Sequence, residues 1–361
     1  MKPAIGILIR ALDLGGAEKQ SLLQAKLMRT EFNVYYIIQK IKPRLKQHLE
    51  FIEREKLNYI QLSGNIFSRS VQLIGIIKKN KIEVIFSFLT KDNILAAVSS
   101  VFLKIVYVGG IRTSNLPPLK FFITKFLHRY FLDYMIFNNF YGREVFIKKG
   151  FLSAKSFVIQ NCISNIQEEK IRPDHKTIKI LSVGRFTPGK DYLTALKTIH
   201  HLRSLVFEKE IEYIIIGDGE LDNQLQTWIK EMQIGNVTIV RLPDNINDYY
   251  LNADIYFICS TFEGLPNTIM EALNYSLPVV STNVGDVNCL LKEGVNGYLA
   301  PVKDYKVLAE KLSELVLNPN KRNAFGLNGH RLLIEEFSEN RFQEQYINFT
   351  KKILLTHQRN R

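Results

Sequence analysis

The chain has 361 residues, of which 46% are hydrophobic, and it carries a net charge of +13 at pH 7. A chain of this length exceeds what one hydrophobic core usually fills, so two domains are expected. The charge is uneven, because residues 1–160 hold 25 Lys and Arg against 10 Asp and Glu while the remainder is nearly neutral. This asymmetry predicts an anionic partner for the first half, whether a phospholipid surface, a nucleic acid or a phosphorylated acceptor.

Cysteine usage and hydropathy argue against a secreted or membrane-spanning protein. The three cysteines show no CxxC spacing, which suits neither a disulfide framework nor a zinc site and favours a cytoplasmic location. The first apolar run, residues 4–9, ends at Arg10 and is shorter than the hydrophobic region of a signal peptide. The longest apolar stretch, residues 94–111, contains Lys104, so we expect a helix and then a strand there.

The first half alternates short apolar runs with helix-length segments. Helices are expected between the strands, for example at residues 17–28, 68–79 and 91–103. Continuous apolar strands separated by helices predict βαβ units and a parallel sheet covered on both faces. Residues 1–163 are therefore predicted to form a doubly wound, Rossmann-like domain with strands at residues 4–10, 33–39, 57–62, 82–88, 105–111, 133–138 and 156–161.

A polar, proline-containing segment, residues 163–177, is typical of an interdomain linker. The alternation then restarts and predicts a second Rossmann-like domain over residues 178–337. Residues 338–361 form a last helix that we expect to pack back on the first domain. The predicted fold class is α/β, with two doubly wound domains that face each other across a cleft at the carboxyl ends of their strands. Strands of the second domain are expected at residues 178–184, 212–217, 237–240, 254–260, 278–282 and 297–301.

The most informative motif is EGLPNTIME, residues 263–271, directly after an apolar strand. Pro266 suits the first position of a helix, and the amides at such a helix start favour a diphosphate. Glu263 and Glu271 would then hold sugar and ribose hydroxyls on either side of it. The alternative is a capped amphipathic helix with solvated glutamates. The donor-binding residues expected here are Gly264, Leu265, Pro266, Asn267, Thr268 and Glu271.

Two cations follow the first strand of the second domain, Arg185 and Lys190 in VGRFTPGKD. At a strand end both side chains can turn towards a ligand, where they would neutralise the negative charge that develops on a departing diphosphate. The alternative is a pair of ordinary surface salt bridges.

Glycine-containing turns follow strands in both halves. Small residues at Gly15-Gly16 and at Asp218-Gly219 let the backbone approach a phosphate or sugar closely, although a tight turn without a ligand needs the same glycines. Arg112 ends the fifth strand, and we expect it on the acceptor side; an ordinary loop arginine is the alternative. No metal-ligating cluster stands out, so no metal is expected.

The ordered set of motifs resembles the retaining, metal-independent family 4 glycosyltransferases of the GT-B fold. In chain order the motifs are GG-A-E, Asn161-Cys162-Ile163, GR-F-x3-K, I-x-G-D-G and EGLP-x4-E. The resemblance covers nearly the whole chain. It implies a hexosyltransferase-type enzyme that uses a nucleotide-diphosphate sugar, with UDP or GDP as the nucleotide, and no cofactor. It also implies catalytic roles for Arg185, Lys190 and Glu263, and donor contacts from Gly16, Asp218 and Gly219.

The resemblance further implies an acceptor site on the first domain, near Gly15 and Arg112, for a glycan or lipid-linked saccharide. Members of the family mostly build bacterial capsule, lipopolysaccharide or other surface glycans. Many relatives have a histidine near Arg112, and this chain does not. Retention implies that the diphosphate itself receives the acceptor proton on the same face, rather than that Glu263 acts as a covalent nucleophile.

Residues 116–134 interleave basic and aromatic side chains, including Lys120, Lys125, Phe122 and Phe126. Such a helix favours contact with an anionic membrane, which would place the protein peripherally at the inner face of the cell membrane. The alternative is an inner helix whose phenylalanines pack on the sheet.

Two other functions are compatible with parts of the sequence. A sugar-nucleotide epimerase or a phosphorylase could have the same fold, but we find no acid and base pair of an epimerase. A basic module that binds membrane or nucleic acid would account for the charge but not for the motifs of the near-neutral half. No RNA-binding signature is present, so no nucleic-acid partner is expected.

Overall fold

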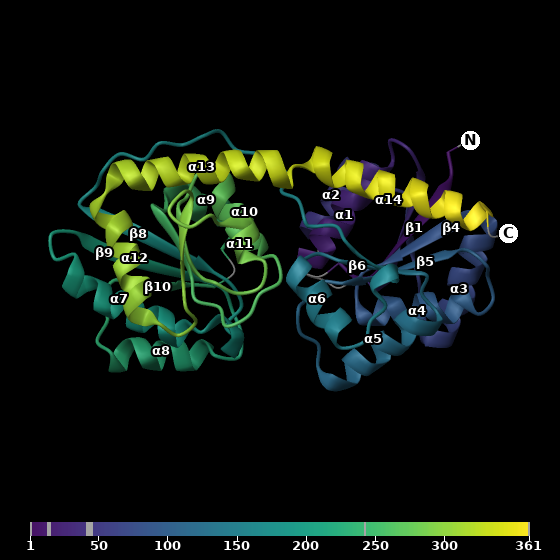
Figure 1. Cartoon of the computed structure of the whole chain (residues 1–361), viewed down its shortest axis with the longest axis horizontal. Coiled ribbons are helices and arrows are strands. Elements are labelled where there is room, and N and C mark those ends of the chain that lie inside the picture. Colours follow the sequence, from purple (N-terminus) through teal and green to yellow (C-terminus); the bar gives the residue numbers. More distant parts are fainter. Residues whose placement is uncertain (1, 13–15, 41–45, 242, 360–361) are drawn as a thin grey trace. The chain divides into compact units, whose positions relative to one another are not determined.

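The computed structural model describes residues 2–12, 16–40, 46–241 and 243–359. The chain forms two compact units (Figure 1). Unit 1 comprises Met1–Ser164 together with Glu339–Arg361, and unit 2 comprises Asn165–Ser338. Unit 1 contains 30 Lys and Arg against 12 Asp and Glu, a net charge of +18, whereas unit 2 contains 18 against 23, a net charge of −5.

Unit 1 is a parallel sheet of seven strands in the order β3-β2-β1-β4-β5-β6-β7. The strands are β1 Ala4–Ala11, β2 Asn33–Lys40, β3 Tyr59–Gln61, β4 Ile82–Ser87, β5 Val106–Ile111, β6 Tyr134–Phe137 and β7 Ser156–Val158. The helices are α1 Gly16–Met28, α2 Lys46–Arg54, α3 Ile66–Lys79, α4 Thr90–Ser100, α5 Pro118–Tyr130, α6 Phe140–Lys148 and α14 Glu339–Arg359.

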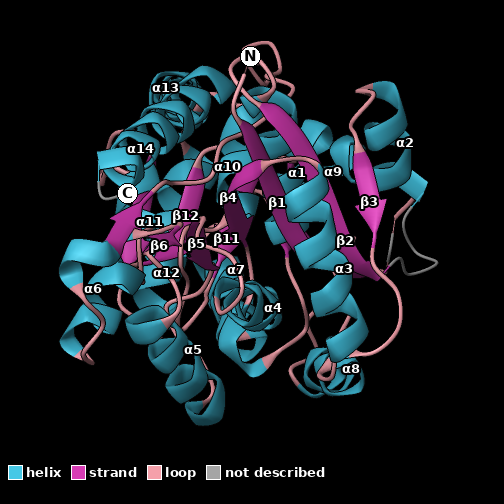
Figure 2. Cartoon of the chain, turned by 90° about the vertical axis from the view of Figure 1, so that its right-hand side faces the viewer, coloured by secondary structure: helices cyan, strands magenta, loops and turns pink. Residues whose placement is uncertain are grey.

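Helices cover both faces of this sheet (Figure 2). Alternate residues of a strand point to opposite faces, so Ile5 and Ile7 of β1 pack with α1 and α14, whereas Leu8 packs with α3 and α4. Burial on both faces explains why the strands are apolar throughout. The last helix, α14, contributes five residues to the core of unit 1: Phe342, Tyr346, Phe349, Ile353 and Leu354.

Unit 2 repeats this arrangement with six parallel strands in the order β10-β9-β8-β11-β12-β13. Its strands are β8 Thr177–Val183, β9 Glu210–Ile216, β10 Val237–Val240, β11 Ile255–Ile258, β12 Val279–Thr282 and β13 Gly297–Ala300. Its helices are α7 Tyr192–Leu205, α8 Asp222–Glu231, α9 Ile246–Asn252, α10 Asn267–Asn274, α11 Val287–Leu290, α12 Tyr305–Leu317 and α13 Pro319–Phe337.

Both sheets reverse their strand order once, between β1 and β4 in unit 1 and between β8 and β11 in unit 2. In open parallel sheets, ligands bind outside the carboxyl ends of the strands at such a reversal. The topology of each unit thus defines where a ligand is expected. None of the helices in the described ranges combines the length and the apolar character that a bilayer span requires.

The segment expected to be a linker is instead part of unit 2, so that prediction was wrong. Arg172 is buried, with an exposed fraction of 4%. Its guanidinium donates hydrogen bonds to backbone carbonyls at 2.6, 2.9 and 2.8 Å, those of Ala253, Ser276 and Tyr275. Burial lowers the pKa of Arg172 to about 10. A polar segment can therefore be fixed in place when one arginine satisfies several buried carbonyls.

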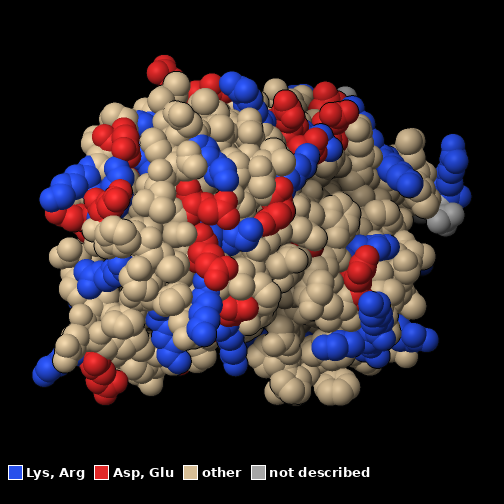
Figure 3. Space-filling model, turned by 60° about the vertical axis from the view of Figure 1, so that its left-hand side comes forward, with Lys and Arg blue, Asp and Glu red and all other residues tan. Residues whose placement is uncertain are grey.

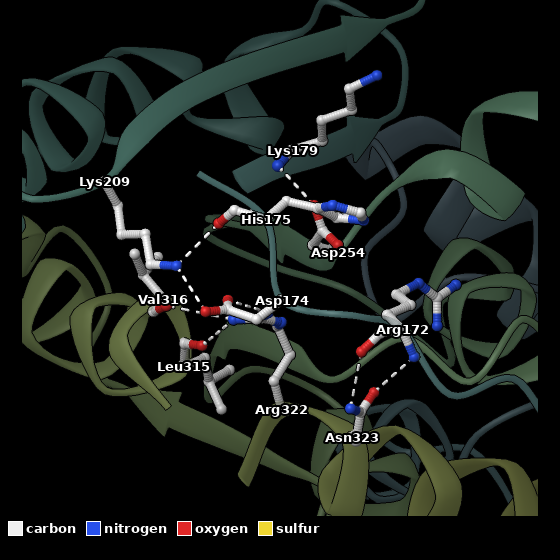
Figure 4. Close-up of polar contacts among 10 residues, drawn as sticks. All are labelled: Arg172, Asp174, His175, Lys179, Lys209, Asp254, Leu315, Val316, Arg322 and Asn323. Carbon is white, nitrogen blue, oxygen red and sulfur yellow. Dashed lines mark hydrogen bonds and ion pairs between the residues drawn. The ribbon is translucent and has the colours of Figure 1, made fainter. Parts of the chain in front are cut away.

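Further contacts along the same segment are drawn in Figure 4. The backbone amide of Arg172 donates to Asn323 Oδ1 at 2.8 Å, and Asn323 Nδ2 donates back to the Arg172 carbonyl at 2.9 Å. Asp174 accepts hydrogen bonds from Lys209 at 2.8 Å and from the buried Arg322 at 3.2 Å. These contacts attach the segment to α13 and to Lys209, the residue before β9.

Candidate active site

Two loops of unit 2 that carry predicted site residues lie side by side. They follow β8 and β11, which are neighbours at the reversal of strand order. The amide of Thr261 donates to the carbonyl of Gly189 at 2.8 Å and joins the loops directly. The structure therefore brings together the motifs around residues 185–190 and 263–271, which are distant in sequence.

The ammonium of Lys190 and the carboxylate of Glu263 form an ion pair across this junction. Lys190 Nζ lies 2.6 Å from Glu263 Oε1, and the side chains are 22% and 14% exposed. The Ser260 hydroxyl donates to the same carboxylate oxygen at 2.6 Å. We predicted that Lys190 and Glu263 act on different parts of the donor. In this structure the two side chains form an ion pair with each other. The sequence analysis missed Ser260, although it ends the apolar run just before Glu263.

Arg185 differs from Lys190 in its surroundings. Its side chain is exposed, and no hydrogen bond or ion pair within the described ranges involves its guanidinium. Its loop is nevertheless fixed, because the Phe186 amide donates to the Asp218 carbonyl at 2.7 Å and the Leu221 amide donates to the Phe186 carbonyl at 3.0 Å. A fixed backbone with an available guanidinium is suited to binding an anion at the carboxyl edge of the sheet.

Gly219 explains why the loop after β9 needs a glycine. A Cβ atom at Gly219 would lie 2.6 Å from the carbonyl oxygen of Phe186 and 2.8 Å from its nitrogen, and the φ of Gly219 is +152°. The glycine therefore permits the close packing that supports the Arg185 loop. Asp218 is exposed beside it. Both predicted residues lie next to the Arg185 loop.

Helix α10 begins at Asn267, one residue later than expected, because Pro266 has an extended backbone, with φ −74° and ψ 115°, and caps the helix. The side chain of Leu265 is buried at 4% exposure, so only its backbone can serve a ligand. Asn267 and Thr268 are half-buried in the first turn. The helix start that we predicted to favour a diphosphate is present, but Pro266 is its cap rather than its first helical residue.

A third loop, after β12, covers the backbone of Glu263 and Gly264. The Asp286 amide donates to the Gly264 carbonyl at 3.0 Å. Gly285 has φ +57°, and a Cβ atom there would lie 2.2 Å from the Glu263 carbonyl oxygen. The sequence analysis did not assign this loop; the glycine shortly after a buried strand was the available signal.

Glu271 lies in the second turn of α10 and is held by a buried tyrosine. The Tyr250 hydroxyl donates to Glu271 Oε2 at 3.0 Å. Tyr250 is 1% exposed and stacks on Tyr275, with ring centroids 5.6 Å apart. Burial raises the pKa of Tyr250 well above its ordinary value, so the hydroxyl remains a donor. No sequence motif marked Tyr250.

In unit 1, Gly16 starts α1 and is exposed, and Gly15 lies outside the described residues. Arg112 follows β5, where its guanidinium donates to the Tyr346 hydroxyl at 3.1 Å and to Asn161 Oδ1 at 3.4 Å. The guanidinium also lies 4.4 Å from the centroid of the Phe88 ring. Arg112 is thus positioned at the carboxyl edge of unit 1 by three side chains.

A cavity of about 460 Å³ in unit 2 lies elsewhere. Its lining includes Lys179 near the start of β8 and Asp254 just before β11, both labelled in Figure 4, so it lies by the amino ends of these strands. None of the predicted site residues lines it. Over the described residues, no group of three or more His, Cys, Asp and Glu side chains could hold a metal ion.

The chain is similar to known proteins of one enzyme class. Residues 164–332 match the model of the family "Glycosyl transferases group 1". Over these residues the chain is similar to the group 1 glycosyl transferases, and the enzyme predicted from the sequence, a glycosyltransferase, is confirmed by the relatives.

One relative spans nearly the whole chain. It is the "GalNAc-alpha-(1->4)-GalNAc-alpha-(1->3)-diNAcBac-PP-undecaprenol alpha-1,4-N-acetyl-D-galactosaminyltransferase" of Campylobacter jejuni, 24% identical over 358 residues, 97% of this chain and 98% of the relative. The "Capsular polysaccharide biosynthesis glycosyltransferase CapM" of Staphylococcus aureus is 21% identical over 300 residues, 77% of each chain. These relatives agree with the expected hexosyltransferase-type enzyme.

The fold class predicted from the sequence, two Rossmann-like domains of the GT-B kind, is confirmed. The crystal structure of Anabaena Alr3699/HepE in complex with UDP matches with a TM-score of 0.83 and 16% identity, covering 97% of this chain and 100% of that one.

Proposed function

We propose that this glycosyltransferase is retaining and metal-independent, and that it moves a hexose from a nucleotide-diphosphate sugar to a glycan or lipid-linked saccharide. The observation that carries the proposal is the arrangement at the strand reversal of unit 2, where an exposed Arg185 lies on a fixed loop next to the Lys190–Glu263 ion pair. Two cations and a helix start at one sheet edge suit a diphosphate.

The proposed roles follow from the contacts of each side chain. Arg185 and Lys190 stabilise the negative charge that grows on the diphosphate as the bond from sugar to phosphate breaks. Glu263 is held by Lys190 and Ser260 and orders sugar hydroxyls. Glu271 is held by Tyr250 and accepts hydrogen bonds from the ribose hydroxyls. The acceptor proton passes to the departing diphosphate, which needs no further base.

The identity of the donor is proposed from the relatives. The Anabaena protein has been crystallised with UDP, with UDP and glucose, and with UDP-glucose, which supports UDP ahead of GDP. The name of the Campylobacter relative includes a PP-undecaprenol acceptor, and the Staphylococcus relative is named for capsular polysaccharide. We therefore place the reaction in bacterial surface-glycan synthesis, with Arg112 on the acceptor side.

The proposal includes a cytoplasmic protein that associates peripherally with an anionic membrane. Support comes from the net charge of +18 on unit 1, compared with −5 on unit 2. On the face drawn in Figure 3, acidic and basic side chains are interspersed, and no broad area carries charge of one sign. The excess of positive charge is therefore not spread evenly over the whole surface.

The first experiment is calorimetric titration of the purified protein with UDP, GDP, ADP and their common sugars in the presence of EDTA. We expect one nucleotide class to bind without metal, and Arg185→Ala to weaken it by about ten- to a hundred-fold. The matched control is Arg331→Ala, which removes an exposed arginine on α13 that pairs with Glu169. Absence of binding by every nucleotide to the folded wild type would refute the proposed donor site.

Acceptor transfer is measured next, with a lipid-linked saccharide and the nucleotide sugar that binds. Transfer with retention of the anomeric configuration is expected, with no isomerisation of the sugar when the acceptor is omitted. Arg112→Ala should raise the KM for the acceptor and leave the nucleotide affinity unchanged. Isomerisation without acceptor would instead indicate an epimerase.

A further inference from the structure

Helix α5 exposes an apolar stripe on the side that faces away from the sheet. Its inner side is buried through Thr124, Leu127 and His128. The outer residues are spaced three, four and four positions apart and therefore lie on one side of the helix. All four are more than half exposed: Leu119 at 73%, Phe122 at 67%, Phe126 at 55% and Tyr130 at 64%. Packing on the sheet thus leaves a substantial part of the apolar surface of this helix uncovered.

The neighbouring helix is followed by two further exposed apolar residues. Helix α4 packs against α5 in the helical layer of unit 1 (Figure 2). Val101 and Phe102 follow its last turn and are 65% and 67% exposed. Exposed aromatic and aliphatic side chains that gather along one side of a helix, as those of α5 do, indicate a binding surface.

The stretch of sequence that carries the stripe has charges of one sign. No Asp or Glu occurs between Asp92 and Asp133, a stretch that contains α5 and most of α4. The same stretch carries five cations: Lys104, Arg112, Lys120, Lys125 and Arg129. Lys120 and Arg129 are exposed on α5 itself, and the Arg129 guanidinium lies 5.9 Å from the ring centroid of Tyr130.

We propose that the outer side of α5, formed by Leu119, Lys120, Phe122, Phe126, Arg129 and Tyr130, lies on the surface of an anionic lipid bilayer. This inference deepens the proposed peripheral association and rests on the proposed function. The apolar side chains enter the boundary between headgroups and acyl chains, and the cations contact lipid phosphates. A second copy of the chain would bring two units of charge +18 together, which like-charge repulsion opposes.

The position of α5 also relates this surface to the acceptor. Only residues 113–117 separate Arg112 from the first residue of the helix. Arg112 is fixed at the carboxyl edge of the unit 1 sheet, where ligands of parallel sheets bind. A lipid-linked saccharide whose tail remains in the bilayer would therefore present its diphosphate close to Arg112.

The test is flotation of the full chain with vesicles of phosphatidylcholine alone or with about one-third phosphatidylglycerol, at low and high salt. The wild type should float with the anionic vesicles only, and more weakly at high salt. Phe122→Ser/Phe126→Ser should abolish flotation, and Lys120→Gln/Arg129→Gln should weaken it by about five-fold for each charge. The control is Phe207→Ser, which removes a phenylalanine of unit 2 that is 83% exposed.

Each variant is also titrated with the nucleotide that the wild type binds and melted thermally. If Phe122→Ser/Phe126→Ser has an unchanged nucleotide affinity and melting temperature, its loss of flotation is due to the changed surface and not to misfolding. The inference is overturned if the folded wild type does not bind anionic vesicles, or if the serine variant still floats with them. Failure of nucleotide binding alone overturns only the proposed donor site. Self-association that is lost in the serine variant, without vesicle binding by the wild type, assigns the surface to a second copy and also overturns it.

Discussion

The buried hydroxyl of Tyr250 donates a hydrogen bond to the carboxylate of Glu271, 3.0 Å away. Tyr250 belongs to α9 and Glu271 to α10, so the bond joins the donor-site helix to its neighbour. Stacking on Tyr275 fixes the ring of Tyr250. Tyr250 is therefore a positioning residue for Glu271.

Tyr250→Phe should weaken binding of the nucleotide by about five- to ten-fold, because a hydrogen bond to a charged group contributes roughly 1.5–3 kcal/mol and the bond here acts through Glu271. The melting temperature should change little, since the ring and its stacking are retained. Calorimetric titration of both proteins with the preferred nucleotide is the measurement. The matched control is Tyr213→Phe, which removes another buried hydroxyl of unit 2, one that contacts Ser182. Equal losses in both variants would argue against a positioning role.

Lys190 and Glu263 should act as a coupled pair. Lys190→Met removes the cation that pairs with Glu263, and we expect kcat to fall by about a hundred- to a thousand-fold, as when one stabilising donor is removed from a transition state. Glu263→Gln should lower kcat less, because Gln can still bond Ser260. The double variant should show less than the product of the two losses, with a coupling of roughly 1–3 kcal/mol. Strictly additive losses would contradict the coupling.

Gly219→Ala should destabilise unit 2 and weaken nucleotide binding together. The new Cβ atom would meet the Phe186 backbone at 2.6 Å and force the Arg185 loop to move. We expect a loss of about 1–3 kcal/mol in the free energy of unfolding, measured by chemical denaturation, together with weaker binding of the nucleotide. Gly75→Ala is the control, since among the described residues no atom outside the adjoining backbone of α3 lies within 4 Å of its added Cβ atom, and alanine favours a helix. Normal nucleotide binding by Gly219→Ala would show that the loop tolerates the change.

His128 should make unit 1 less stable in mild acid. Burial lowers the pKa of His128 from 6.5 to about 4, and its Nε2 accepts a hydrogen bond from the Leu152 amide at 3.1 Å. Between these pH values the unfolded chain binds a proton that the folded chain does not, so stability falls as the pH is lowered from 6.5 towards 4. The loss attributable to this residue is on the order of 1–3 kcal/mol.

The measurement is the free energy of unfolding of the wild type and of His128→Gln from pH 7.5 to 4.5. The glutamine side chain keeps an acceptor for the Leu152 amide and does not titrate. The difference between the two proteins should shrink or reverse in acid, because only the wild type is destabilised by protonation of this side chain. Parallel curves would contradict the assignment to His128.

Most of the fold followed from the sequence because its signal is local. Continuous apolar strands between helices specify parallel sheets, and the motif residues that follow β8 and β11 meet because adjacent strands end at the same edge. Arg185, Lys190 and Glu263 could be assigned to one site because each follows a strand and because the ordered motifs resemble a known family. Their proposed roles remain predictions.

What the sequence did not reveal depends on contacts between distant residues. Tyr250 is recognisable only from its bond to Glu271, and Asp286 only from its bond to the Gly264 carbonyl. The segment around Arg172 looked like a linker because its polarity is local, whereas its carbonyl partners lie 81, 104 and 103 positions later. The sequence likewise did not determine whether the α5 stripe is exposed, because its residues suit an inner helix equally well.

The contribution of α14 to the core of unit 1 affects how the protein is made. Unit 2 is one continuous stretch, Asn165–Ser338, whereas unit 1 needs residues from both ends of the sequence. During translation, the ribosome releases the whole of unit 2 before α14 emerges, so the unit begun first is completed last. Until then the sheet face that α14 covers stays exposed to water, and a nascent chain stalled before residue 339 would be a substrate for chaperones that bind apolar surfaces.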